Sequence, residues 1–241
     1  MSFNGKNAFV TGAGKGIGKA IALGLAAKGA NLILADINEA NLSSVAAEAE
    51  AFGVQVKTAI LDVSDEKAVH AAMQASIAAF GQIHILINNA GIYPKNHFLT
   101  DSSDLWKKII DVNILGTMYV TQAVLPHMLE KGYGRIVNIG SVAGVYGLSY
   151  FVDYSMTKGA VISFTKALAK LVSGQGVTVN CVSPGSIDVT DDGTGKVAEH
   201  SFTGRPGTPE ECANVVIFLA SDEASYVSGQ NYLVDGCRKK M

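Results

Sequence analysis

Short apolar runs alternate with segments of helical periodicity along the whole chain of 241 residues. We expect strands near residues 7–12, 31–36, 55–61, 83–88, 134–139, 177–182 and 231–234. We expect helices near residues 17–28, 39–52, 66–80, 103–130, 154–173 and 209–220. Such alternation predicts an α/β fold, a doubly wound parallel sheet of about seven strands (Rossmann fold) with right-handed crossovers. Ligands of such sheets bind outside the carboxyl ends of the strands.

The chain is expected to form a single domain over residues 1–241. No Pro/Ser-rich linker or block of charge divides it, and 48% of its residues are hydrophobic, enough for a core with helices on both faces of a sheet.

Composition and charge argue against several classes of protein. A formal net charge of -2 gives no electrostatic basis for binding nucleic acid or an anionic membrane. The N-terminus lacks the pattern of a signal peptide, and no apolar run is long enough to cross a bilayer. Three isolated cysteines, Cys181, Cys212 and Cys237, and five scattered histidines lack metal-ligand spacing, so we expect no metal. Unpaired cysteines without a secretion signal suggest reduced thiols and a cytoplasmic protein.

A glycine-rich turn follows the first apolar run. Gly12, Gly16 and Gly18 lie between the expected strand and a helical segment. Glycines let the backbone approach a pyrophosphate, whose charge suits a helix N-terminus. The alternative is a glycine-rich helix start that binds no ligand.

Tyr154 and Lys158 lie four residues apart at the start of a segment with helical apolar spacing, so both side chains face one side of a helix. At ~4 Å and an effective dielectric of ~20, an ammonium would stabilise a phenolate by about 4 kcal/mol before desolvation. That attraction would lower the pKa of the tyrosine toward the range useful for a general acid/base. The alternative is a lysine stem that merely covers a partly buried tyrosine.

These two motifs, with Asn88-Asn89-Ala90-Gly91 between them, resemble the short-chain dehydrogenase/reductase family in its compact single-domain form, from residue 6 to about 236. The resemblance implies an NAD-dependent oxidoreductase that transfers a hydride reversibly between NAD(H) and a secondary alcohol or ketone. It implies four catalytic residues: Asn113 in a water relay, Ser141 orienting the substrate oxygen, Tyr154 exchanging the proton, and Lys158 lowering the pKa of Tyr154. Ser141 lacks the Gly-x-Ser-x-Gly surroundings of a hydrolase nucleophile.

The resemblance also implies a set of cofactor contacts. They are Gly12, Lys15, Gly16, Ile17, Gly18, Asp36, Asp62, Val63, Asn89, Gly91, Tyr154, Lys158, Pro184, Gly185 and Ile187. Asp36 ends the second expected strand, where a carboxylate accepts hydrogen bonds from ribose hydroxyls and repels a 2′-phosphate, so NAD is favoured over NADP. Lys15 is the counter-argument, since it could attract that phosphate. Asp62 or Ser64 could instead cap the next helix, with or without an adenine contact.

The chain departs from the family pattern near its carboxyl end. Val189 stands where the family usually has Thr, with Thr190 one residue later. A short polar lid near residues 190–204 is expected to cover the pocket. Cys237 stands where a second Gly is usual. The run from Arg205 to Glu211 looks structural, with a Thr cap, a Pro and acidic residues at a helix start.

Three alternatives to this function stay open. One is an NADPH-dependent 3-oxoacyl-[acyl-carrier-protein] reductase, against which Asp36 and the absence of a basic cluster argue. Another is a nucleotide-sugar epimerase or dehydratase, whose glycine spacing differs. The third, from another class, is a non-catalytic NAD-sensing protein. The family also implies a homotetramer (or homodimer) through the helices at 103–130 and 154–173. Five residues could line either an apolar substrate pocket or a subunit interface: Tyr93, Val145, Tyr146, Tyr150 and Phe151.

Overall fold

The computed structural model describes residues 1–94, 98–189 and 201–239. Seven parallel strands form one sheet in the order β3-β2-β1-β4-β5-β6-β7. The strands are β1 (Asn7–Thr11), β2 (Asn31–Asp36), β3 (Val56–Ile60), β4 (Ile85–Asn88), β5 (Gly134–Ile139), β6 (Val177–Pro184) and β7 (Asn231–Val234). The strand order reverses direction between β1 and β4, which is the point where a doubly wound sheet opens a crevice for its ligand. The predicted fold class is confirmed.

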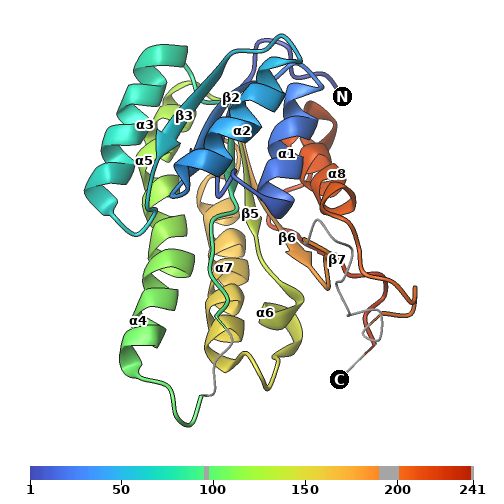
Figure 1. Cartoon of the computed structure of the whole chain (residues 1–241). Helices are drawn as coiled ribbons and strands as arrows, with labels where there is room; N and C mark the ends of the chain where they lie inside the picture. The colour runs from blue at the N-terminus through green and yellow to red at the C-terminus, as the bar shows by residue number, and fades with distance from the viewer. Residues whose placement is uncertain (95–97, 190–200, 240–241) are drawn as a thin grey trace.

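Helices cover both faces of the sheet (Figure 1). They are α1 (Gly16–Ala26), α2 (Glu39–Glu50), α3 (Glu66–Phe80), α4 (Ser103–Ile110), α5 (Gly116–Glu130), α6 (Val142–Tyr146), α7 (Val152–Leu171) and α8 (Pro209–Ala220). Successive strand residues alternate between the two cores: Val10 packs with α1, α2 and α8, whereas Phe9 packs with α3, α5 and α7. Both faces of the sheet are therefore buried, as its apolar strands require.

The long helix expected over residues 103–130 is interrupted. A π-helix, η1 (Asp111–Leu115), separates α4 from α5 and contains Asn113. π-bulges often mark functional sites, and this one contains a residue for which the family resemblance implies a catalytic role. The 28-residue segment is long and apolar enough to span a membrane, yet its residues Val120, Val124 and Met128 are buried in the core against the sheet.

The short helix α6 was not predicted from the sequence. Its five residues are too few to show a helical period, and its start depends on Ser141, whose Oγ accepts a hydrogen bond from the backbone N–H of Ala143 (3.1 Å). At α8 the structure confirms the expected cap. Thr208 and Glu211 form a reciprocal capping box.

Candidate active site

The four predicted catalytic residues come together at the carboxyl end of β5. Tyr154 and Lys158 lie on α7, and Ser141 directly follows β5. Lys158 Nζ lies 5.8 Å from the centre of the Tyr154 ring, and Tyr154 hydrogen-bonds with Ser141. Tertiary packing thus joins three residues that the sequence separates.

Gly91 connects Asn113 to this group. A methyl group added at Gly91 would lie 3.2 Å from Asn113 Oδ1 and 3.5 Å from Lys158 Nζ. Because no side chain occupies that space, the backbone after β4 approaches both residues. Gly91 is therefore at the catalytic group itself, as well as on the expected cofactor path.

Asn113 is fully buried and held by three hydrogen bonds. Its Oδ1 accepts from the N–H of Ile92 (2.8 Å), and its Nδ2 donates to the carbonyl of Ile92 (2.9 Å) and to Thr157 Oγ1 (3.1 Å). Its own backbone carbonyl accepts from Thr117 Oγ1 (3.0 Å). The side chain of Asn113 therefore fixes the loop after β4.

The pKa values differ from the sequence expectation. Burial raises the pKa of Tyr154 to about 12, while its hydrogen bond with Ser141 acts in the opposite direction. Lys158 is not among the causes of this shift. Burial lowers the pKa of its own ammonium, to about 8, and the ammonium donates to the carbonyl of Ile139 (2.7 Å). The expected lowering of the pKa of Tyr154 by Lys158 is therefore not found in the protein without its cofactor, where desolvation of the phenol dominates.

The glycine-rich turn has the close packing expected of a phosphate-binding loop. Gly12 has φ +61°, and a methyl group there would lie 2.9 Å from the backbone of Ala90. Gly18 packs directly on the carbonyl of Gly12. Asn89 Nδ2 donates to the carbonyls of Thr11 (3.0 Å) and Gly12 (2.9 Å), so β4 braces the turn.

The start of α1 leaves its amide groups available. Lys15 occupies the N-cap with no side-chain cap, and its side chain is exposed. Gly16 follows with φ +54°, and Ile17 packs partly into the core. Uncapped N–H groups at a helix N-terminus suit a pyrophosphate.

Asp36 is held rigidly at the end of β2. Its Oδ2 accepts from the N–H of Gly14 (2.9 Å), and its Oδ1 accepts from the N–H of Asn38 (2.9 Å). A methyl group at Gly14 would lie 3.0 Å from this carboxylate. The turn therefore holds the carboxylate in one orientation beside the loop, where it can accept further hydrogen bonds from a ribose.

Asp62 and Val63 follow β3 but do not cap the next helix. Asp62 Oδ1 accepts from the N–H of Ser64 (2.9 Å) and from its hydroxyl (2.6 Å). The N-cap of α3 is Asp65, which accepts from Ala68 N (3.0 Å), so the proposed cap at Asp62 or Ser64 was wrong by one to three residues. The buried Val63 packs against Gly116 at the start of α5.

The segment after β6 borders the same crevice. Pro184 ends β6, Gly185 N donates to the carbonyl of Val234 (2.9 Å), and Ile187 pairs with residue 207 in a parallel bridge. A methyl group at Gly16 would lie 3.3 Å from Val189. Val189 thus reaches the phosphate loop without a hydroxyl to offer it. Thr190 and most of the expected lid lie outside the described residues.

A buried polar network behind the site had only a partial signal in the sequence. Asn88 Nδ2 donates to Asn138 Oδ1 (2.8 Å) and Thr121 Oγ1 (2.9 Å), and Asn138 Nδ2 donates to Thr165 Oγ1 (2.9 Å). Asn88 and Asn89 belong to a motif that the sequence analysis singled out, whereas Asn138, Thr121, Thr157 and Thr165 were missed. A polar side chain inside the apolar run of β5 was the signal for Asn138.

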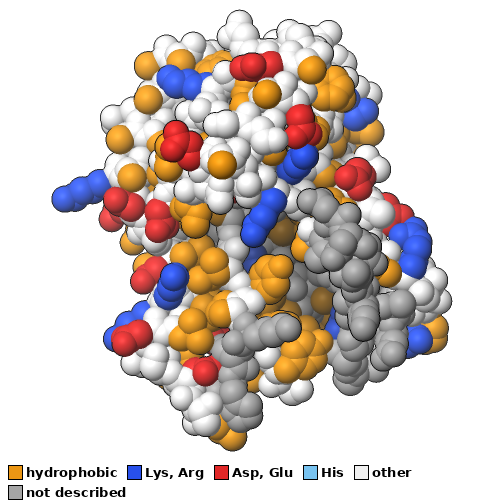
Figure 2. Space-filling view, viewed as in Figure 1, with side chains coloured by type: hydrophobic (Ala, Val, Ile, Leu, Met, Phe, Trp, Pro, Cys, Tyr) orange, Lys and Arg blue, Asp and Glu red, His pale blue; other side chains and the backbone are white. Residues whose placement is uncertain are grey.

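Aromatic side chains line one side of the site. The ring of Tyr154 lies 6.0 Å from that of Tyr93 and 5.9 Å from that of Phe151, and the Phe151 ring lies 4.9 Å from that of Tyr150. Figure 2 shows a hollow on this face of the molecule, with apolar side chains gathered along it. These contacts place Tyr93, Tyr150 and Phe151 beside the candidate site, and the choice between substrate pocket and subunit interface stays a prediction.

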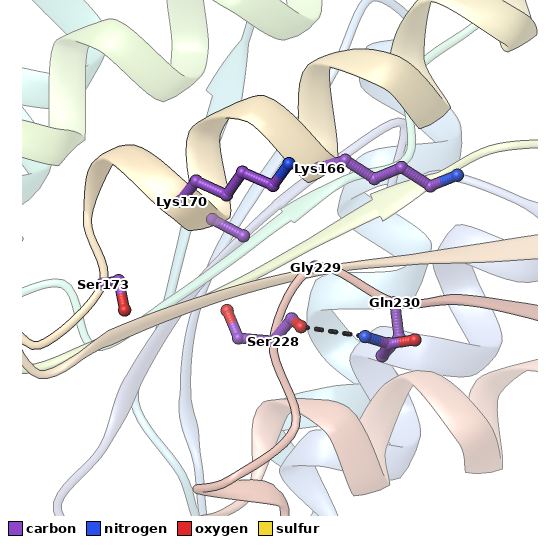
Figure 3. A pocket seen from close by; sticks show the side chains of 7 residues that line it. Lys166, Lys170, Ser173, Ser228, Gly229 and Gln230 are labelled. Carbon is purple, nitrogen blue, oxygen red and sulfur yellow. Dashed lines mark hydrogen bonds between the residues drawn. The ribbon is translucent and has the colours of Figure 1, made fainter.

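A cavity in the described part of the chain lies away from this site. It has a volume of about 570 Å³ and is lined by the end of α7 and the turn before β7, with Lys166, Lys170, Ser173, Ser228 and Gln230 (Figure 3). None of the sequence motifs falls in it.

Comparison with known proteins decides the family. A model described as "Enoyl-(Acyl carrier protein) reductase" matches residues 12–237. The chain is 39% identical over 242 residues, 98% of both chains, to the 3-oxoacyl-[acyl-carrier-protein] reductase of Thermotoga maritima. This chain belongs to the short-chain dehydrogenase/reductase family. It is an oxidoreductase of that family, as the resemblance in its motifs implied.

Two solved structures of short-chain dehydrogenases/reductases are similar throughout. A 3-oxoacyl-[acyl-carrier protein] reductase with bound NAD from Brucella melitensis is 34% identical, with a TM-score of 0.90 over 98% of this chain and 91% of that one. An NAD+-bound xylitol dehydrogenase is 32% identical, with a TM-score of 0.91 over 98% and 100%. The relatives thus favour the acyl-carrier reductase, the alternative in our sequence analysis, over a general secondary alcohol dehydrogenase.

Proposed function

We propose that this protein is an NAD(H)-linked ketoreductase that reduces the 3-oxo group of acyl thioesters to a 3-hydroxy group. The observation that carries the proposal is the partly buried group of Tyr154, Lys158, Ser141 and Asn113 beside the glycine-rich turn, in a chain similar to 3-oxoacyl-[acyl-carrier-protein] reductases. A protein that only sensed NAD would need the loop and Asp36 but not this group.

The nucleotide fits the residues present. The packing of Gly12 and Gly18 and the uncapped start of α1 would hold the pyrophosphate, and Gly91, Lys158, Pro184, Gly185 and Ile187 would border the nicotinamide half. When bound, the cofactor supplies the hydride. The protein supplies position, exclusion of water and a proton.

Tyr154 would give its proton to the substrate oxygen. A phenol whose pKa is raised to about 12 stays protonated at neutral pH, which suits an acid acting in the direction of reduction. Ser141, hydrogen-bonded with Tyr154, would orient the same oxygen by donating to it. Lys158 would return a proton to Tyr154 through a water that the carbonyl of Asn113 would help to hold, since Lys158 with a pKa of about 8 can both release and take a proton.

The cofactor is proposed to be NAD. Asp36 is fixed by two backbone N–H groups, so its carboxylate cannot turn away from a 2′-phosphate. Two unit charges ~4 Å apart repel by about 4 kcal/mol at an effective dielectric of ~20. Lys15 offers a compensating charge only on an exposed, flexible stem.

The test is the oxidation of NADH and NADPH, followed in parallel by absorbance with 3-oxobutyryl-coenzyme A as substrate. We expect turnover with NADH, at least about a hundredfold less efficient turnover with NADPH, and none for Tyr154→Phe, which should still bind NADH. Asp36→Ala should reduce the preference for NADH over NADPH. Efficient turnover with NADPH alone would refute the choice of cofactor. Turnover by Tyr154→Phe would refute the assigned proton donor.

A second candidate is NAD-linked oxidation of a secondary alcohol such as a polyol. Asp36 and the similarity to the NAD+-bound xylitol dehydrogenase favour it. A panel of polyols, cyclic diols and steroids with NAD decides between the two substrates. Binding of NADH without turnover on thioesters or alcohols would instead support the sensor.

We also propose a homotetramer, or a homodimer, located in the cytoplasm. Met118 on α5 and Val152 and Met156 on α7 are exposed by 42% to 51%, an apolar surface that a partner copy would cover. Light scattering of the purified protein measures the assembly. A monomer at micromolar concentration would contradict this proposal.

A further inference from the structure

The carboxyl-terminal residues 235–239 fold back beside residues 201–203. Phe202 N donates to the carbonyl of Cys237 (3.0 Å), and Thr203 N donates to that of Gly236 (3.4 Å). Ser201 and Arg238 form an antiparallel bridge. Residues 235–239 are therefore fixed to residues 201–203, within the described part of the expected lid.

A left-handed turn directs this segment. Gly236 has φ +61° and Cys237 has φ +58°, and Cys237 is the one non-glycine residue with positive φ in the described ranges. Asp235 Oδ1 accepts from Cys237 N (3.0 Å) and supports the turn. A side chain is unfavourable in this conformation, and such strained residues cluster at functional sites. The turn sets the direction of the next residue, Arg238.

Arg238 lies next to Tyr150, the outermost of the aromatic side chains Tyr154, Phe151 and Tyr150 that line the candidate site. Its Nη2 donates to the hydroxyl of Tyr150 (3.5 Å), and the Tyr150 ring contacts that of Phe151, which contacts the ring of Tyr154. The guanidinium is therefore two ring contacts away from the proposed proton donor, on the side where a long substrate would extend.

The guanidinium of Arg238 has no carboxylate partner within the residues that the structure describes. The other two arginines are paired, Arg135 with Asp222 (3.2 Å) and Arg205 with Glu211 (2.6 Å). Arg238 is partly buried, so its donors are directed by the turn and by Tyr150. A planar, partly desolvated guanidinium without a carboxylate partner is suited to a phosphate.

We propose that Arg238 is a specificity-determining residue that binds the phosphate at the far end of a pantetheine-linked acyl substrate. The inference rests on the proposed function and deepens it. The acyl thioester would lie along Phe151 and Tyr150 with its oxo group at Tyr154. The pantetheine chain would then end with its phosphate at Arg238. A neutral thioester of the same acyl group would react without this contact.

Binding tests the proposal without turnover. Calorimetry compares pantetheine 4′-phosphate with pantetheine, two ligands that differ only in the phosphate, on the NADH complex. We expect the phosphate form to bind about tenfold more tightly to the wild-type protein and equally to Arg238→Gln. Lys239→Gln is the matched control, because the Lys239 ammonium lies over the Phe202 ring (5.7 Å). Equal binding by the wild-type protein, or a preference that survives in Arg238→Gln, would overturn the proposal.

Kinetics separates this inference from the function on which it rests. Arg238→Gln should lower kcat/KM about tenfold for 3-oxobutyryl-coenzyme A and leave it unchanged for the N-acetylcysteamine thioester of the same acid. An equal loss on both thioesters would show a structural role and overturn the proposal. If the wild-type protein reduces neither thioester, the proposed function has failed, and the binding comparison still decides the role of Arg238.

Discussion

Replacement of Lys158 by methionine is expected to abolish turnover and yet to stabilise the fold at neutral pH. The ammonium is buried, and its one hydrogen bond in the structure goes to the carbonyl of Ile139. A buried charge with so few partners is unfavourable, whereas methionine fills a similar volume without charge. The site would thus hold a residue that function requires and stability opposes.

The magnitude follows from the pKa. Burial lowers the pKa of Lys158 to about 8, against ~10.4 in the unfolded chain, so the unfolded state binds more protons between these values and stability rises with pH across this window. The cost of the charge is roughly 3 kcal/mol at pH 7 and about 1 kcal/mol at pH 9.5. Loss of the hydrogen bond to Ile139 destabilises the variant by about 1 kcal/mol, which offsets part of this gain. Lys158→Met should therefore be about 2 kcal/mol more stable at pH 7, and about equal at pH 9.5.

The assay is thermal unfolding without cofactor, at one protein concentration and at both pH values. For a chain of this size, a gain of 2 kcal/mol raises Tm by about 4–8 °C. Lys166→Met, on the exposed side of the same helix, is the control and should show no such pH-dependent gain. A variant Lys158→Met that is less stable than the wild-type protein at pH 7, or a difference that does not change with pH, would refute the reasoning.

Three further predictions concern packing, acid stability and the cofactor. Gly159→Ala should raise stability by up to about 1 kcal/mol in thermal unfolding, because the added methyl would lie at an ordinary contact distance, 3.5 Å, from the carbonyl of Gly144 in α6. Gly144→Ala should instead lower it by about 2 kcal/mol, since its methyl would lie 2.5 Å from the α7 backbone. Burial lowers the pKa of His84 to about 4, so stability should fall as the pH drops from 6.5 through 4, and acid titration of His84→Asn should show a flatter profile. Val189→Thr places a hydroxyl beside Gly16 and should tighten NAD binding about fivefold, as measured by calorimetry. An unchanged affinity for NAD would contradict this prediction.

The sequence by itself determined the fold class, and it supplied the residues of the candidate site. The order of strands and helices followed from local periodicity, and the α/β alternation left few arrangements of a parallel sheet. Gly12 and Gly18 marked the phosphate loop because only glycine permits such close backbone contact. The spacing of Tyr154 and Lys158 placed both on one helical face, which the structure retains in α7. These features are local, and the sequence encodes them directly.

Tertiary structure alone decided what depends on contacts between distant segments. Burial set the direction of the pKa of Tyr154, because desolvation depends on everything packed around the phenol and outweighs one neighbouring charge. Hydrogen bonds join Asn113 to Ile92 and Arg238 to Tyr150, which lie 21 and 88 residues apart in the sequence. Periodicity and spacing describe only neighbours along the chain, so they cannot supply the distances across the fold on which desolvation and these contacts depend.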